Sequence, residues 1–125
     1  MNTQGKKLYP FVPSGPNFQE SLKFFVELGF EKLWENENDG LAALRFGEAQ
    51  FLLSNIDIQE WQSNQIIVYE VDDLEAYYLE LQAKDIPTKF PGRKIGPPTD
   101  YPWGREVQFI DPGGVCWHVR QYEGN

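Results

Sequence analysis

The sequence predicts an α+β fold in which one order of elements occurs twice. Each half of the chain has the pattern of a strand, then a helix, then two or three further strands. The two halves span about residues 6–55 and 65–121, and a polar connector at 56–64 joins them. A chain of 125 residues with 41% hydrophobic residues is long enough to build one core. We therefore expect a single domain, residues 1–125, made of two βαβββ modules.

The first module begins with a strand at residues 6–13, whose prolines favour an edge of the sheet. A helix follows, because Asn17 is a suitable N-cap and Glu20 stands three residues later, as in a capping box. Gly29 is the expected end of this helix. Three apolar residues recur at helical spacing along it: Leu22, Phe25 and Val26. Three strands, at residues 31–37, 41–46 and 50–55, complete the module.

The second module begins with an apolar strand at residues 65–71. Asp72 and Asp73 can cap the helix that comes next, whose apolar stripe consists of Leu74, Tyr77, Tyr78 and Leu81. The stretch 87–102 contains five prolines, which favour a loop. It also carries three basic residues: Lys89, Arg93 and Lys94.

Two strands joined by an Asp-Pro-Gly-Gly turn end the module, because proline fixes one backbone angle and the glycines can take positive φ. Residues alternate along the last strand. Val115, Trp117 and Val119 face one way, whereas Cys116, His118 and Arg120 face the other. His118 is the only histidine of the chain. A hairpin with one apolar and one chemically mixed face is a candidate cavity wall.

This closing hairpin resembles the vicinal-oxygen-chelate superfamily, which includes glyoxalase I, extradiol dioxygenases and bleomycin resistance proteins. The run Pro102-Trp103-Gly104-Arg105-Glu106, with Cys116 and His118 in the last strand, is most similar to the bleomycin-binding resistance proteins. The segments 21–30 and 71–74 also follow the superfamily pattern, so the resemblance covers about residues 8–120. It implies that the two modules bend into a cupped, open mixed barrel, with helices outside and a cavity on the concave side.

The resemblance also bears on metal binding. Metal-dependent members hold a divalent cation through His and Glu at four inward positions, which fall here on Pro10, Ser54, Ile66 and His118. Three of these residues cannot act as such ligands, and catalytic metal sites keep about three protein ligands. We therefore expect no metal, no cofactor and no catalytic residue. The alternative is a metal-dependent lyase, isomerase or dioxygenase, which would need ligands from another register, such as Glu70, or from a partner chain.

The predicted ligand site consists of aromatic residues in polar surroundings together with polar residues of the strands: Trp34, Ser54, Trp61, Tyr101, Trp103, Cys116 and His118. Aromatic side chains in loops offer flat surfaces to planar ligands. Trp103 falls on the tryptophan that lines the drug groove in the resembled family. Simpler roles stay open for the others: Trp34 could cover a sheet edge, and His118 could be a hydrogen-bonded wall residue.

Charge and composition narrow the function further. A net charge of −8 argues against nucleic-acid binding and favours a cationic or neutral ligand. One cysteine excludes an internal disulfide and fits a reducing, cytoplasmic compartment. The sequence has no apolar run near ~20 residues and no signal-peptide pattern, so no membrane partner is expected.

Together, the residues and the resemblance predict a metal-free protein that sequesters a cationic glycopeptide antibiotic of the bleomycin type in the groove of a homodimer. The second alternative is a protein that binds an unrelated small molecule. Residues 87–101 differ from the drug-binding branch, because they are richer in proline and basic residues than an acidic drug groove suggests.

Overall fold

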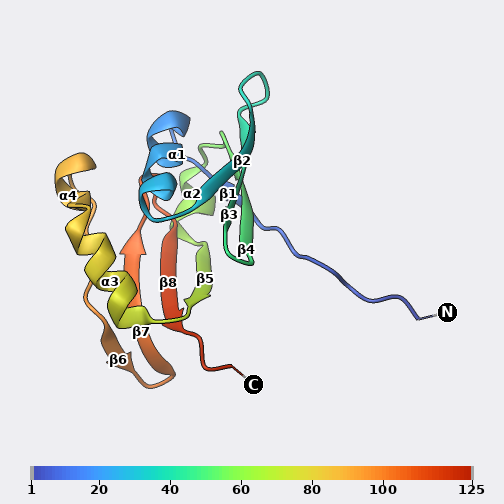
Figure 1. Ribbon diagram of the computed structural model, residues 1–125. Coiled ribbons are helices and arrows are strands. Elements are labelled where there is room, and N and C mark those ends of the chain that lie inside the picture. Colours follow the sequence, from blue (N-terminus) through green and yellow to red (C-terminus); the bar gives the residue numbers. More distant parts are fainter. Residues whose placement is uncertain (1, 125) are drawn as a thin grey trace.

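Two four-stranded mixed sheets share one hydrophobic core in the computed structural model, which describes residues 2–124 (Figure 1). The strand order is β1-β4-β3-β2 in the first sheet and β5-β8-β7-β6 in the second. In each sheet the first strand of the module pairs in parallel with the last, and the remaining pairs are antiparallel. The predicted α+β fold of two βαβββ modules is therefore confirmed.

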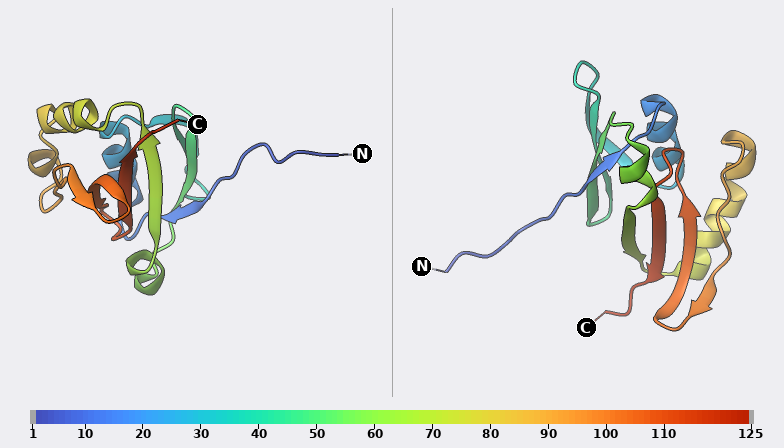
Figure 2. Two further views of the ribbon diagram at one scale, coloured as in Figure 1. Left: turned by 90° about the horizontal axis from the view of Figure 1, so that it is seen from below. Right: turned by 180° about the vertical axis from the view of Figure 1, so that it is seen from behind.

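The first module contains β1 (Phe11–Pro13), α1 (Phe18–Glu27), β2 (Glu31–Asn36), β3 (Leu41–Phe46) and β4 (Ala49–Ser54). The predicted cap of α1 is confirmed, because the Asn17 side chain accepts a hydrogen bond from the Glu20 backbone N–H at 3.0 Å. Two details differ from the prediction. Val26 is 48% exposed, and Phe24 takes its place in the buried stripe. The first strand begins only at Phe11, and the segment before it extends away from the body (Figures 1 and 2).

Helix α2 (Gln59–Ser63) lies in the connector. The second module contains β5 (Ile66–Val71), α3 (Leu74–Ala83), α4 (Ile86–Lys89), β6 (Thr99–Tyr101), β7 (Gly104–Ile110) and β8 (Cys116–Gln121). Asp73 caps α3 by accepting a hydrogen bond from the Ala76 backbone N–H at 3.0 Å. The proline-rich stretch is only partly a loop, since α4 and the short strand β6 lie in it. Within residues 2–124, the structure has no helix long and apolar enough to cross a membrane.

Aromatic side chains of α1 join the two modules into one core. Phe25 packs against Phe51 of the first sheet and Trp117 of the second, with ring centroids 4.9 and 5.1 Å apart. Phe24 contacts Phe109 in the same way, at 5.7 Å. Trp117 is 1% exposed, as expected for a core residue. Because one helix supplies contacts to both sheets, neither module has a complete core of its own.

The modules also touch where two backbones meet. A Cβ atom on Gly113, in the turn before β8, would lie 2.7 Å from the Ser14 carbonyl oxygen at the start of the first module. The fully buried Gln62 of α2 fastens the same junction by donating a hydrogen bond from Nε2 to the Gly113 carbonyl at 2.9 Å. This close packing fixes the position of the closing hairpin relative to the first module.

Side chains alternate across the second sheet, so that one of its faces packs into the core and the other faces away from it. Alternate residues such as Val107, Trp117 and Val119 are buried in the core. The other residues of β5, β7 and β8 form what we call the open face: Ile66, Val68, Glu70, Glu106, Gln108, Ile110, Cys116, His118 and Arg120. Ile66 and Val68 are 61% and 44% exposed. The open face is therefore the surface on which a ligand or a partner can be held.

Candidate functional site

A buried carboxylate lies at the centre of the open face. Glu106 on β7 is fully buried, and the strand register places it opposite Arg120 on β8. Arg120 donates a hydrogen bond from Nε to Glu106 Oε2, and Gln108 donates from Nε2 to Oε1 at 3.0 Å. His118 Nδ1 lies 3.1 Å from the same Oε1 atom. Both carboxylate oxygens are therefore engaged, and three neighbours are held in place around one charge.

The electrostatics of this cluster keep Glu106 ionised. Burial raises the pKa of the Glu106 carboxyl, but hydrogen bonds from Arg120 and Gln108 lower it by more. The pKa therefore lies below the ordinary value of 4.5. At neutral pH the carboxylate balances the Arg120 guanidinium, so the centre of the open face carries no large net charge.

An aromatic pair stands beside the cluster at the turn between β6 and β7. The rings of Tyr101 and Trp103 are stacked, with centroids 5.2 Å apart and an angle of 8° between their planes. Trp103 is 57% exposed, so one side of the pair is available to a ligand. Stacked aromatic rings form a flat platform that suits a planar heteroaromatic group.

Four of the seven predicted ligand-site residues lie in the second sheet or its turns: Tyr101, Trp103, Cys116 and His118. The other three lie elsewhere. Trp34 is on β2 and 48% exposed, Ser54 is buried at the end of β4, and Trp61 is 56% exposed on α2. Within one chain the structure does not bring all seven to one cavity.

The setting of Cys116 disfavours the thiolate form of its side chain. Burial raises the pKa of its thiol, and the nearby charges of Glu106 and Asp111 raise it further. The reactive form of cysteine is the thiolate, which these effects disfavour. Cys116 therefore presents a small polarizable surface, mostly in the thiol form, to the open face.

Glu106, Gln108 and Arg120 were missed as site residues by the sequence reasoning. Alternation had placed Gln108 and Arg120 on the polar faces of their strands, and Glu106 belongs to the run that carried the family resemblance. What the pattern lacked was the register between β7 and β8, which sets Glu106 opposite Arg120 and Gln108 opposite His118. A hairpin register derived from the turn length would have identified the cluster.

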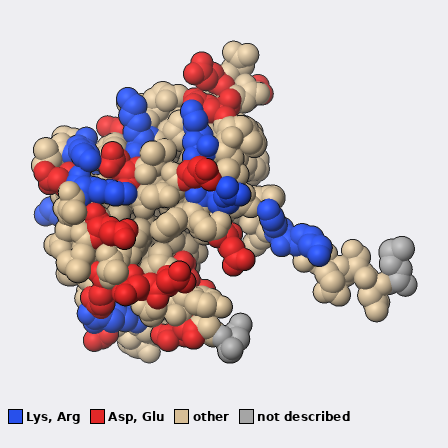
Figure 3. Space-filling model, in the orientation of Figure 1, with Lys and Arg blue, Asp and Glu red and all other residues tan. Residues whose placement is uncertain are grey.

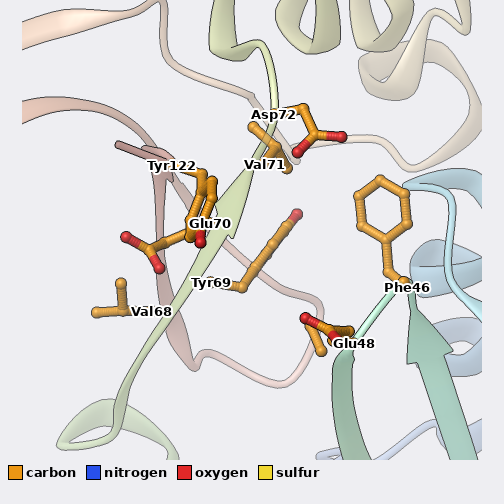
Figure 4. A pocket seen from close by; sticks show the side chains of 10 residues that line it. Phe46, Glu48, Val68, Tyr69, Glu70, Val71, Asp72 and Tyr122 are labelled. Carbon is orange, nitrogen blue, oxygen red and sulfur yellow. The ribbon is translucent and has the colours of Figure 1, made fainter. Parts of the chain in front are cut away.

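Two clefts of about 570 Å³ each lie outside this cluster. One of them lies between the β3–β4 turn and the free edge of β5 (Figure 4). Its walls carry Glu48, Glu70 and Asp72 beside aromatic rings that include Tyr69 and Tyr122. We call it the acidic cleft. Among the described residues 2–124, no three His, Cys, Asp or Glu side chains lie together in an arrangement that could hold a metal ion.

Comparison with known proteins agrees with this architecture. The family model described as "Glyoxalase/Bleomycin resistance protein/Dioxygenase superfamily" matches residues 14–119. A search of curated proteins found no matching sequence. Among solved structures, a bleomycin-binding protein complexed with bleomycin is 22% identical, with a TM-score of 0.77, and the match covers 95% of this chain and 100% of that one.

Two further structures are similar. A bleomycin-binding protein from bleomycin-producing Streptomyces verticillus, complexed with copper(II)-bleomycin, is 26% identical with a TM-score of 0.75, covering 96% of this chain and 100% of that one. A bleomycin resistance determinant encoded on the transposon Tn5 is 22% identical with a TM-score of 0.78, at the same coverage. The chain belongs to the glyoxalase/bleomycin resistance protein/dioxygenase superfamily.

Proposed function

We propose that this protein binds a small molecule without a metal ion and sequesters an antibiotic of the bleomycin type in a groove at a homodimer interface. The observation that carries the proposal is the open face, where a fixed polar cluster stands beside the exposed platform of Tyr101 and Trp103. The similar structures that bind bleomycin support the same ligand class. No covalent step is needed, because holding the drug is enough to keep it from its target.

The site offers complementary contacts to such a ligand. A planar ring can stack on the free side of Trp103, while His118 and Gln108 present polar atoms beside it. The net charge of −8 attracts a cationic drug and speeds its association.

We also propose that residues 1–125 form a single domain, with modules at about 6–55 and 65–121. A cytoplasmic location suits the single free thiol of Cys116.

Trp103→Ala should weaken bleomycin binding by about 1–3 kcal/mol, the typical effect of removing an aromatic anchor that the ligand covers. Isothermal titration calorimetry with bleomycin measures the change. Leu79→Ala is the control, because Leu79 is similarly exposed, at 63%, but lies on α3, outside the open face and the predicted ligand site. If both variants bind as tightly as the wild type, the aromatic platform is not the ligand site. If the wild type does not bind at ~100 μM, the fold serves another ligand.

The purified protein should contain no stoichiometric transition metal. The reason is the chemistry of the chain, since Pro10, Ser54 and Ile66 stand where the family's metal enzymes have ligands. Elemental analysis after purification without chelators measures metal per chain. About one zinc, nickel, iron or manganese ion per chain would contradict the proposal and favour an enzyme.

The protein should be a homodimer in solution, with twice the chain mass of 14.5 kDa. The segment before β1 extends into solvent with Leu8 89% exposed, and Phe11 and Trp34 are 54% and 48% exposed (Figure 2). Apolar surface of this kind is stabilised when a second chain covers it. Light scattering at micromolar concentration measures the mass, and a variant that lacks residues 2–9 should shift toward monomer. A wild-type mass near 14.5 kDa would rule out the dimer.

A further inference from the structure

A smaller cavity, of about 380 Å³, adjoins the open face and carries the opposite charge to the acidic cleft. The loop before β6 forms one wall, and the ends of β7 and β8 form the other. Its lining consists of Gly92, Arg93, Lys94, Gly96, Gln108, Phe109, Ile110 and Cys116. We call it the basic pocket. Two of the three basic residues by which stretch 87–101 differs from an acidic drug groove, Arg93 and Lys94, line this pocket, whereas Lys89 pairs with Glu27.

The loop that carries the two basic residues is anchored to the sheet. Gly96 donates a backbone hydrogen bond to the Gln108 carbonyl at 3.0 Å, and Ile95 forms a β-bridge with Phe109. The Arg93 side chain is held as well, since Nη1 donates to the Asp111 backbone carbonyl at 3.0 Å. One hydrogen bond leaves most of the five guanidinium donors free for a ligand.

The two positive charges of the pocket are not balanced locally. Within residues 2–124, neither Arg93 nor Lys94 forms an ion pair with a carboxylate, although acidic residues outnumber basic ones by 19 to 11 in the chain. The surface charge is also uneven: acidic side chains gather toward the lower end of the face seen in Figure 3. Unpaired cations that converge on a pocket are suited to bind an anion.

The basic pocket is continuous with the candidate site. Gln108 lines the pocket and also donates its hydrogen bond to Glu106. Cys116 lies in the pocket wall, two residues before His118 on the same face of β8. A ligand on the open face can therefore reach Arg93 and Lys94 with one end, while Glu70 on the same face belongs to the acidic cleft.

We propose that the basic pocket binds an oxyanion group, such as a carboxylate, sulfate or phosphate ester, carried by the ligand of the open face. The guanidinium of Arg93 would take two oxygens, and Lys94 and Gln108 would donate to the remaining ones. The ligand is then bipolar, with a cationic end toward the acidic cleft and an anionic end at the basic pocket. That the anionic group belongs to a ligand of the open face rests on the proposed function. The anion site itself does not depend on the proposed function.

Inorganic phosphate is the first probe, because it tests the pocket without any drug. In a titration followed by amide NMR, the signals of Gly92, Gly96 and Cys116 should shift together and saturate. Arg93→Gln and Lys94→Gln should each weaken this binding about tenfold, as expected for a lost charge-assisted hydrogen bond. Lys23→Gln, an exposed residue of α1, removes the same charge elsewhere and should change nothing. Shifts that are absent, scattered or unaffected by both pocket variants overturn the proposal.

A second experiment compares two compounds to test whether the basic pocket binds an anionic group that is part of the open-face ligand. Bleomycin with its terminal amine is compared with bleomycinic acid, which has a free carboxylate at that position. Arg93→Gln should weaken binding of the acid about tenfold more than binding of the amine. Equal effects on the two compounds would restrict the pocket to free anions and overturn the bipolar ligand. If neither compound binds, the proposed drug binding fails, whereas the phosphate titration still decides the anion site.

Discussion

Gly113→Ala should lower the free energy of unfolding by about 2–4 kcal/mol, because it forces extra volume into a closely packed junction. The new Cβ would lie 2.7 Å from the Ser14 carbonyl oxygen and 3.0 Å from the Pro13 carbonyl oxygen. Both are backbone atoms of the first module, so they cannot rotate away as a flexible side chain could. The closing hairpin would have to move, and the hydrogen bond from Gln62 to the Gly113 carbonyl would be disturbed.

Two other glycines calibrate this effect in urea unfolding. Gly5→Ala has no neighbour within 4 Å of its Cβ and should leave stability unchanged. Gly96→Ala meets the Gln108 carbonyl oxygen at 3.2 Å, a distance that a small shift relieves, so an intermediate loss is expected. A Gly113→Ala variant as stable as the Gly5→Ala control would show that the two modules are not packed as described.

The role of Gly113 also shows where sequence reasoning stops. The Asp-Pro-Gly-Gly pattern predicted a tight turn, and the turn is there, with Gly114 at φ +100°. Gly113 needs to be glycine for another reason. The backbone of Ser14, about a hundred residues away in the chain, lies so close that it leaves no space for a Cβ atom. Turn chemistry is local and visible in the sequence, whereas a close approach between modules is not.

The same distinction between local and long-range interactions applies to the helices and strands of the fold. Helix α1 and its Asn17 cap were predictable, because capping and apolar spacing act within a few residues. The first strand was predicted too long. Its pairing with β4 is a long-range contact, and only three of its residues, Phe11 to Pro13, find a partner strand. The order of elements followed from the pattern, but the cupped arrangement came from the family resemblance.

The candidate site combines predictable and unpredictable parts for the same reason. Trp103 and His118 could be singled out because their residue types and surroundings are unusual in the sequence. Glu106 does not stand out by its residue type, since a charged residue in a strand ordinarily faces solvent, and the β7–β8 register is what sets it against Arg120. The residue that holds the cluster together, Glu106, is therefore placed by the pairing of β7 with β8 and not by its residue type.

Asp111 should make stability depend on pH in the direction opposite to most carboxylates. Burial raises the pKa of its carboxyl to about 6, although hydrogen bonds from the Trp117 indole and the Val115 and Gly113 backbone N–H groups lower it. In the unfolded chain the pKa is the ordinary 3.8. Between these values the folded protein keeps a proton that the unfolded chain has released. Stability therefore decreases as pH rises through this window, and the loss is complete above about pH 6.

The size of this effect is about 3 kcal/mol, the free-energy equivalent of the pKa difference. Asp111→Asn should abolish it, because the amide does not titrate and its oxygen can still accept from the Gly113 and Val115 N–H groups. Urea unfolding at several pH values from 4 to 7 compares the two proteins, and titration of every other group cancels in the difference. Relative to the variant, the wild type should lose about 2 kcal/mol across that range, since part of the full effect lies below pH 4. A difference that stays constant with pH, together with an Asp111 pKa near its ordinary value by carboxyl NMR, would show that the buried carboxyl is not desolvated in the turn.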